Sequence, residues 1–118
     1  MDLMPTIVEA TRATYPKRYM GQAIQPMEGV SLVGNLKGEA LMERSIGFEH
    51  RFARAWRKGD WKIAWGKRMP EEAEWELYNL AVDRTERNNL ANSHPERVAA
   101  LAAEWMEWAH RIGVKVTN

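Results

Sequence analysis

The sequence predicts an α+β fold: a small four-stranded antiparallel sheet with a long C-terminal helix packed on one face. Two observations lead to this prediction. Between Ser45 and Leu80, short segments of alternating apolar and polar residues follow one another through tight turns, as the strands of a meander do. Residues 95–112 then repeat apolar side chains at helical spacing. A short N-terminal helix and a long loop are expected to precede the sheet.

The N-terminal part reads as a helix followed by a loop. Residues Asp2–Ala13 predict a short helix, with the first of them as N-cap and Pro5 tolerated in the first turn. Proline and glycine punctuate Thr14–Val30, which predicts a long irregular connection. Such a loop is unusual within 118 residues and indicates a segment that crosses the surface of something larger. We therefore divide the chain into 1–40 and 41–118.

The strands of the sheet can be placed individually. They are expected at Ser45–His50, Ala53–Arg57, Trp61–Trp65 and Trp75–Leu80. A short hairpin turn at residues 58–60 joins the second strand to the third, with Gly59 free to take a positive φ. Trp61, Ile63 and Trp65 share one face of the third strand. At this spacing an aromatic stripe is more often core than a ligand platform.

The C-terminal helix is the clearest element. Pro95 suits the first helical position, Ser93 or His94 is the expected cap, and Gly113 is the natural stop. Its apolar stripe is formed by Val98, Leu101, Ala102, Trp105, Ala109 and Ile112. Each large side chain buried on that stripe stabilises the fold by roughly 1.5–3 kcal/mol before entropy is counted.

Composition excludes several classes of function. The formal net charge is +1, which gives no electrostatic reason to expect nucleic acid or a membrane surface as partner. The absence of cysteine rules out disulfides and thiolate chemistry. No apolar run is long enough to cross a bilayer, and the N-terminus does not resemble a signal peptide. The three histidines lie far apart without metal-ligand spacing, so no metal site is expected.

Four stretches carry a further pattern. They are Asp2-Leu3-Met4-Pro5-Thr6; Glu28-Gly29-Val30-Ser31-Leu32; Phe48-Glu49-His50 through Ala55-Trp56-Arg57-Lys58-Gly59-Asp60-Trp61-Lys62; and Glu76-Leu77-Tyr78-Asn79-Leu80 followed by Asp83, Thr85, Glu86, Asn88 and Leu90. In this order and spacing they resemble the C-terminal part of type I sulfatases (arylsulfatase-like enzymes of the alkaline phosphatase superfamily). The resemblance covers nearly the whole chain, although Arg84 stands where proline is usual.

The resemblance implies a fold and a missing partner. In sulfatases this region is a four-stranded sheet with a long helix, and the chemistry belongs to an N-terminal catalytic domain. That domain supplies a formylglycine nucleophile, made from Cys or Ser in C/S-x-P-x-R, and the ligands of a divalent cation, usually calcium. This chain has no Asp-Asp or Asp-Asn pair. We therefore expect no catalytic residue, metal ligand or cofactor in it, and the missing catalytic domain as its partner.

One literal match to the nucleophile motif has a simpler explanation. Residues 93–97 read Ser-His-Pro-Glu-Arg, which fits S-x-P-x-R. The residues that follow are those of an amphipathic helix rather than the Leu, Thr and Gly of the sulfatase motif. A cap followed by proline in the first turn accounts for the match.

The same resemblance places the end of the first strand near the active-site rim. Glu49, His50 and Arg54 are accordingly the candidate substrate-binding residues. A histidine beside a carboxylate can act as a general acid or base or contact an anion, and a guanidinium can bind sulfate. Strand alternation separates Arg54 from Arg51 and Arg57. The alternative is that these residues form hydrogen bonds at a subdomain interface.

Hypotheses from three classes follow. The first is a sulfatase fragment that completes the fold and the active-site rim but has no turnover alone. The second is a free-standing interaction or self-association module derived from a sulfatase tail. The third, a small enzyme using Glu49 and His50, rests only on their adjacency. A fragment cut from its catalytic domain is expected to expose apolar side chains and form a homo-oligomer through the N-terminal region. Those side chains are Leu3, Met4, Ile7, Val8, Met20 and Met27.

Overall fold

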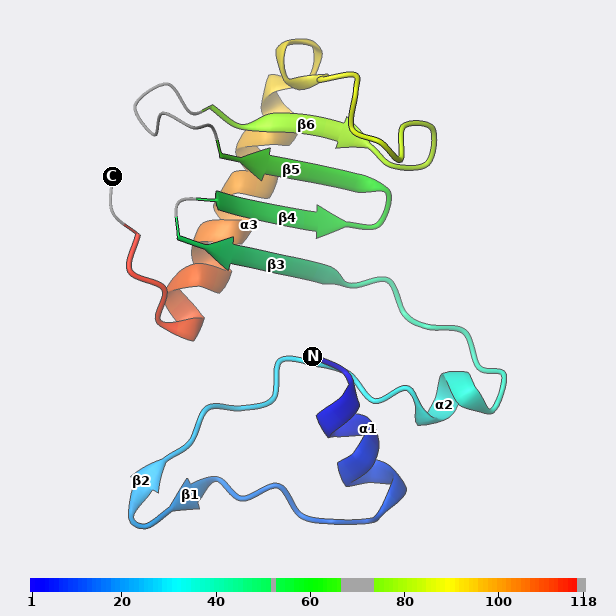
Figure 1. The fold of residues 1–118 in the computed structure, drawn as a ribbon, viewed down its shortest axis with the longest axis vertical. Helices are drawn as coiled ribbons and strands as arrows, with labels where there is room; N and C mark the ends of the chain where they lie inside the picture. Colours follow the sequence, from blue (N-terminus) through cyan, green and yellow to red (C-terminus); the bar gives the residue numbers. More distant parts are fainter. Residues whose placement is uncertain (52, 67–73, 117–118) are drawn as a thin grey trace. The chain divides into compact units, whose positions relative to one another are not determined.

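The computed structural model has the predicted α+β fold (Figure 1). It describes residues 1–51, 53–66 and 74–116. The chain separates into two compact units, Met1–Met42 and Glu43–Asn118. The first unit holds two short helices and a small hairpin, whereas the second holds the sheet and the long helix.

The first unit begins with a helix that is shorter than predicted. Helix α1 spans Leu3–Ala10 rather than Asp2–Ala13. It ends early because Arg12 has a φ of 56°, a left-handed conformation of the kind that terminates helices. The N–H of Ala13 then bonds back to the carbonyl of Val8 at 2.9 Å.

Asp2 is the N-cap residue, as predicted, but its side chain does not cap the helix. Its carboxylate accepts a hydrogen bond from the backbone N–H of Val30 at 3.2 Å. The hydroxyl of Thr6 accepts from the N–H of Leu32 at 2.9 Å and donates to the Asp2 carbonyl at 2.6 Å. The N-cap residue and one residue of α1 thus hold the far end of the loop.

The loop expected to be irregular contains a hairpin. Strands β1 (Arg18–Tyr19) and β2 (Gln22–Ala23) pair antiparallel. Met20 and Gly21 between them have φ values of 46° and 79°, as the central residues of a type I′ turn require. The loop then leads into the short helix α2 (Val33–Leu36).

The second unit contains the predicted meander. Its strands are β3 (Ser45–His50), β4 (Ala53–Lys58), β5 (Trp61–Trp65) and β6 (Glu76–Asn79). They lie in the order β3-β4-β5-β6, and every neighbouring pair is antiparallel. Strand β4 is one residue longer than predicted, and β6 lacks the first and last residues of the predicted strand. A 3₁₀ turn at Ala91–Ser93 leads into helix α3 (Pro95–Ile112).

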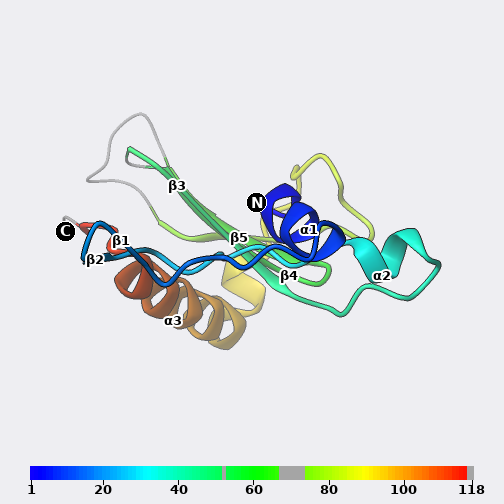
Figure 2. The ribbon, with the colours of Figure 1, turned by 90° about the horizontal axis from the view of Figure 1, so that it is seen from below.

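Helix α3 crosses one face of the sheet (Figures 1 and 2). Trp105 of the helix, Ile63 of β5 and Leu77 of β6 are fully buried between them. The predicted stripe is confirmed, but it omitted Trp108, which is also buried and lies one helical turn beyond Trp105. Gly113 ends the helix with a φ of 81°, as predicted.

Tryptophans form a continuous chain through this core. Trp65 contacts Trp75, Trp75 contacts Trp105 and Trp105 contacts Trp108, with ring centroids 5.5, 5.8 and 6.3 Å apart. Trp108 in turn lies 5.9 Å from Trp56. These tilted and edge-on geometries are the favourable ones for aromatic pairs. Of the aromatic stripe on β5, Ile63 is fully buried core, as predicted, whereas Trp61 and Trp65 are only half-buried.

The edge strand β3 approaches α3 closely at Gly47. A Cβ atom added there would lie 2.5–2.6 Å from three atoms of the Trp108 ring. The same strand accepts a hydrogen bond at the Phe48 carbonyl from the indole N–H of Trp105, at 3.1 Å. Contact between strand and helix thus requires a residue without a side chain at position 47.

We predict that Gly47→Ala destabilises the protein by about 1–3 kcal/mol, because the added methyl group forces the helix and the strand apart. Urea denaturation at fixed protein concentration, followed by tryptophan fluorescence, measures the change. Ser45→Ala in the same strand is the control and should stay within about 0.5 kcal/mol of the wild type. A Gly47→Ala variant as stable as the wild type would contradict the close approach.

Candidate functional site

Two of the predicted substrate-binding residues meet across the β3–β4 hairpin. Glu49 and Arg54 are cross-strand partners, and Arg54 in turn faces Trp65 of β5. Directly opposed residues on one face of a sheet have Cβ atoms about 4.5–5.5 Å apart. Gly47, two residues before Glu49, faces α3. Glu49 and Arg54 therefore lie on the helix-facing side of the sheet.

The guanidinium of Arg54 lies against two aromatic rings. Its Cζ atom is 5.2 Å from the ring centroid of Trp105 and 5.5 Å from that of Trp65. Cation–π contacts of this kind hold a flexible side chain in place and contribute about 0.5–2 kcal/mol, depending on exposure. Arg54 is half-buried, so the charge sits where the core meets solvent.

His50 lies on the opposite face of the sheet. It is exposed, and the alternation of β3 directs it away from Glu49 and toward the side that carries Phe48. Adjacent residues of a strand cannot act side by side on one bound group, so an acid–base pair of Glu49 and His50 is not formed. This geometry removes the only support for a small enzyme built on their adjacency.

All three residues nevertheless border one groove. It has a volume of about 590 Å³ and lies where the ends of β3, β4 and β5 meet the last turn of α3. Trp65, Trp108 and Ile112 supply apolar walls, Glu49 and Arg54 supply polar side chains, and His50 lies at the border of the groove. An apolar groove with a few convergent polar groups is the usual form of a small-molecule site. A guanidinium held in such a groove can donate hydrogen bonds to an oxyanion.

The sequence did not identify the residues that position Arg54. Trp65 and Trp105 hold its guanidinium, but in sequence both read only as core residues. Trp65 could have been found from strand pairing, because the β4–β5 turn sets Arg54 opposite it. Trp105 comes from the far end of the chain, and no local pattern connects it to Arg54.

A separate polar cluster occupies the other face of the sheet. Lys62 of β5 pairs with Glu86 at 2.6 Å, and the hydroxyl of Tyr78 donates to Glu76 at 2.9 Å. Burial, followed by the neighbouring Glu76 carboxylate, raises the pKa of Tyr78 to about 12. Each described group here has a partner within the fold, which is typical of a structural cluster.

The loop after β6 is held by its own side chains. The Asp83 carboxylate accepts hydrogen bonds from the N–H groups of Arg87 and Asn88 at 2.9 and 2.8 Å. These bonds favour the ionised form and lower the pKa of Asp83. The side-chain oxygen of Asn89 accepts from Leu77 and Ala91. The motif D-x-T-E-x-N thus shapes a turn.

The segment that matches S-x-P-x-R has a structural role. Pro95 is the first residue of α3, as predicted. Of the two caps predicted, Ser93 and His94, the structure has His94 at the N-cap position. Neither Ser93 nor His94 caps the helix through its side chain. Instead the His94 carbonyl accepts from the N–H groups of Arg97 and Val98.

The described part of the chain offers no cluster of ionisable groups suited to a metal. In residues 1–51, 53–66 and 74–116, no three His, Asp or Glu side chains are grouped so that they could hold an ion. Among the same residues, no helix is long and apolar enough to traverse a bilayer.

Comparison with known proteins gives related chains of much greater length. An uncharacterised sulfatase of Schizosaccharomyces pombe (strain 972) is 29% identical over an alignment of 118 positions, which covers 97% of this chain and 21% of the relative. The chain thus spans about a fifth of the length of this curated relative. No protein-family model matches the chain.

Two solved structures share the fold. One comes from work on the metabolism of multiple glycosaminoglycans by Bacteroides thetaiotaomicron, with a TM-score of 0.68, 21% identity and coverage of 90% of this chain and 24% of that one. The other is a protein in complex with its substrate D-glucosamine-2-N,6-O-disulfate, with a TM-score of 0.61, 20% identity and coverage of 93% and 23%. With the curated relative, they confirm the predicted resemblance to a sulfatase C-terminal subdomain.

Proposed function

We propose that this chain is a sulfatase C-terminal subdomain, which completes the fold and the active-site rim and has no turnover alone. The chain aligns almost throughout with about a fifth of a sulfatase. The alignment over 97% of this chain is the observation that carries the proposal. The parent enzyme is then a sulfuric ester hydrolase, and the missing N-terminal catalytic domain is the partner. That domain supplies the formylglycine and the calcium ion.

The chemistry within the described residues supports a role without catalysis. The polar clusters on the sheet and in the loop after β6 are bonded within the fold. The groove beside Arg54 has a cation but no adjacent acid–base pair on the same face. Glu49, His50 and Arg54 therefore serve as contacts at the rim, where Arg54 attracts the sulfate group of a substrate.

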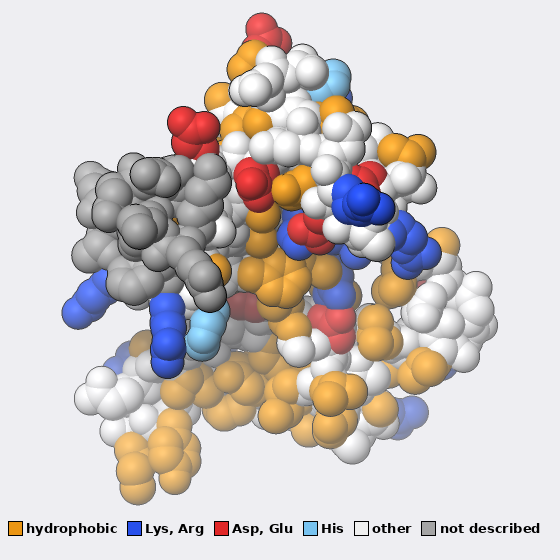
Figure 3. All heavy atoms as spheres, turned by 45° about the horizontal axis from the view of Figure 1, so that its top comes forward, with side chains coloured by type: hydrophobic (Ala, Val, Ile, Leu, Met, Phe, Trp, Pro, Cys, Tyr) orange, Lys and Arg blue, Asp and Glu red, His pale blue; other side chains and the backbone are white. Residues whose placement is uncertain are grey.

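Exposed apolar side chains favour the second candidate, a self-associating module. In the unit Met1–Met42, Leu3, Ile7 and Met20 are 75%, 54% and 85% exposed, as expected for a surface that lacks its partner. Of the six side chains expected to be exposed there, Val8 and Met27 are instead half-buried. Hydrophobic side chains, coloured orange, form part of the molecular surface in Figure 3.

We predict that the chain alone does not hydrolyse 4-nitrophenyl sulfate above the buffer rate. Mixed with the fission-yeast relative shortened by the segment that this chain matches, it should restore hydrolysis. In that mixture Arg54→Met should raise KM by about tenfold, the effect of losing one charged hydrogen bond. Lys115→Gln, which removes an exposed charge elsewhere, is the control and should leave KM unchanged. Clear turnover by the chain alone would refute the proposal.

We also predict that the isolated chain forms a dimer or larger oligomer through α1. Light scattering coupled to size-exclusion chromatography should give the mass of at least two chains. The double variant Leu3→Gln/Ile7→Gln, whose positions share one helix face, should shift the chain toward monomer. Val82→Gln replaces an apolar residue of the other unit that is 84% exposed, and it should change nothing. A monomeric wild type with residues 1–30 protected from amide exchange would contradict this prediction.

A further inference from the structure

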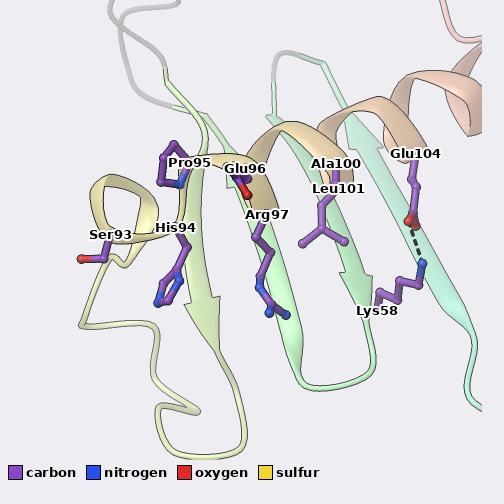
Figure 4. Close-up of a pocket in the computed structure, with 9 residues that line it drawn as sticks. All are labelled: Lys58, Ser93, His94, Pro95, Glu96, Arg97, Ala100, Leu101 and Glu104. Atoms are coloured by element: carbon purple, nitrogen blue, oxygen red, sulfur yellow. Dashed lines mark hydrogen bonds and ion pairs between the residues drawn. The ribbon is translucent and has the colours of Figure 1, made fainter.

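A second groove lies at the start of α3, on the same face of the sheet (Figure 4). Its volume is about 710 Å³, and its lining includes Lys58 from the end of β4 and the first turns of the helix. All five residues of the segment that matches S-x-P-x-R line the groove, and the proposed function assigns them no role. Its cationic side chains come from two separate elements.

Arg97 presents a fixed guanidinium to this groove. Its Cζ atom lies 4.1 Å from the ring centroid of Trp61, a close stacking distance. Stacking occupies a face of the planar group and leaves the N–H donors in its plane available. Among the residues that the structure describes, this guanidinium makes no hydrogen bond or ion pair. Trp61 thus holds an exposed set of donors in place.

His94 stands beside Arg97. Its ring meets the same Trp61 edge-on, with centroids 5.8 Å apart and an angle of 67° between the planes. In Figure 4 both side chains extend from the start of α3 toward the sheet. One tryptophan therefore positions two nitrogen-bearing side chains next to each other.

Lys58 supplies a second cation on the opposite side of the groove. Its ammonium bonds to Glu104 at 2.6 Å, and the indole N–H of Trp56 donates to the same carboxylate at 3.0 Å. The hydrogen bond from Lys58 is the main reason that the pKa of Glu104 is lowered. An ammonium has three donors and this bond uses one of them. Lys58 and Glu104 thus form a pair without net charge, in which the ammonium keeps donors for a ligand.

The helix terminus itself contributes little. Pro95 has no N–H, and the N–H groups of Arg97 and Val98 already bond to the His94 carbonyl at 3.1 and 3.2 Å. Glu96 also lines the groove, and its exposed carboxylate opposes an anion, although solvent screens its charge as it screens that of Arg97. Binding must therefore depend on side chains.

We propose that this groove binds a tetrahedral oxyanion, a sulfate or phosphate group, with Arg97 as the principal donor, His94 beside it and Lys58 on the opposite side of the groove. Planar guanidinium donors match the oxygen atoms of such groups in pairs, which an ammonium cannot do. The anion is either free in solution or an ester on a saccharide. This inference does not depend on the chain being part of a sulfatase.

The test is a titration of the full chain at constant ionic strength. NMR chemical shifts of its backbone and indole N–H groups report binding. The ligands are sodium sulfate, sodium phosphate and glucosamine 6-sulfate, with sodium chloride as the reference. We expect saturable shifts at the indole N–H of Trp61, assigned by Trp61→Phe. Arg97→Gln should weaken binding at least about tenfold, as the loss of a charged hydrogen bond does. Arg97→Lys retains the charge and should weaken it less.

Arg87→Gln removes an exposed arginine outside the groove and is the matched control, with binding expected to be unchanged. Near-ultraviolet circular dichroism checks that each variant keeps the tryptophan core. Tighter binding of the ester than of inorganic sulfate identifies a sulfated saccharide as the source, and equal binding identifies the free anion; both support the site. The proposal is overturned if the shifts do not saturate, or if Arg97→Gln and Arg87→Gln weaken binding equally.

Discussion

The structure of the Glu43–Asn118 unit depends above all on one side chain, the fully buried Trp105. Its indole N–H donates to the Phe48 carbonyl at 3.1 Å, which fixes α3 to the edge strand of the sheet. Its ring continues the tryptophan chain on both sides and lies 5.2 Å from the guanidinium of Arg54. A buried indole without a partner for its N–H is costly, so packing and hydrogen bonding require the same geometry. The groove beside Arg54 is a consequence of that core.

The residues that carry the resemblance to sulfatases mostly hold backbone in place. Asp2 and Thr6 bond to the N–H groups of Val30 and Leu32, which joins two of the matching stretches. Asp83 shapes the turn after β6, and Gly59 takes the positive φ of the β4–β5 turn. These are requirements of a fold, and they suit a chain that aligns with about a fifth of a sulfatase. A resemblance that rests on such residues indicates a similar fold more than a similar activity.

Periodicity was enough to predict most of the second unit. Strand alternation and the helical stripe locate β3 to β6 and α3 because one face of each element is buried. Alternation alone also separates His50 from Glu49, a distinction that the resemblance obscured. Other features depend on distant contacts. These are the contact of Arg54 with Trp105, the hydrogen bond from Val30 to Asp2 and the stacking of Arg97 on Trp61. Each joins residues that no local sequence pattern relates.

The central claim is that Trp105 makes the sheet and α3 one cooperative structure, and amide hydrogen exchange of the whole chain tests it most directly. The slowest amides of β4, β5 and α3 should exchange at a common rate. Trp105→Leu should accelerate all three elements together by about a hundredfold, the effect of losing roughly 3 kcal/mol of core stability. If the variant accelerated exchange in α3 alone and left the strands protected, the sheet would be stable without the helix and the account would be wrong.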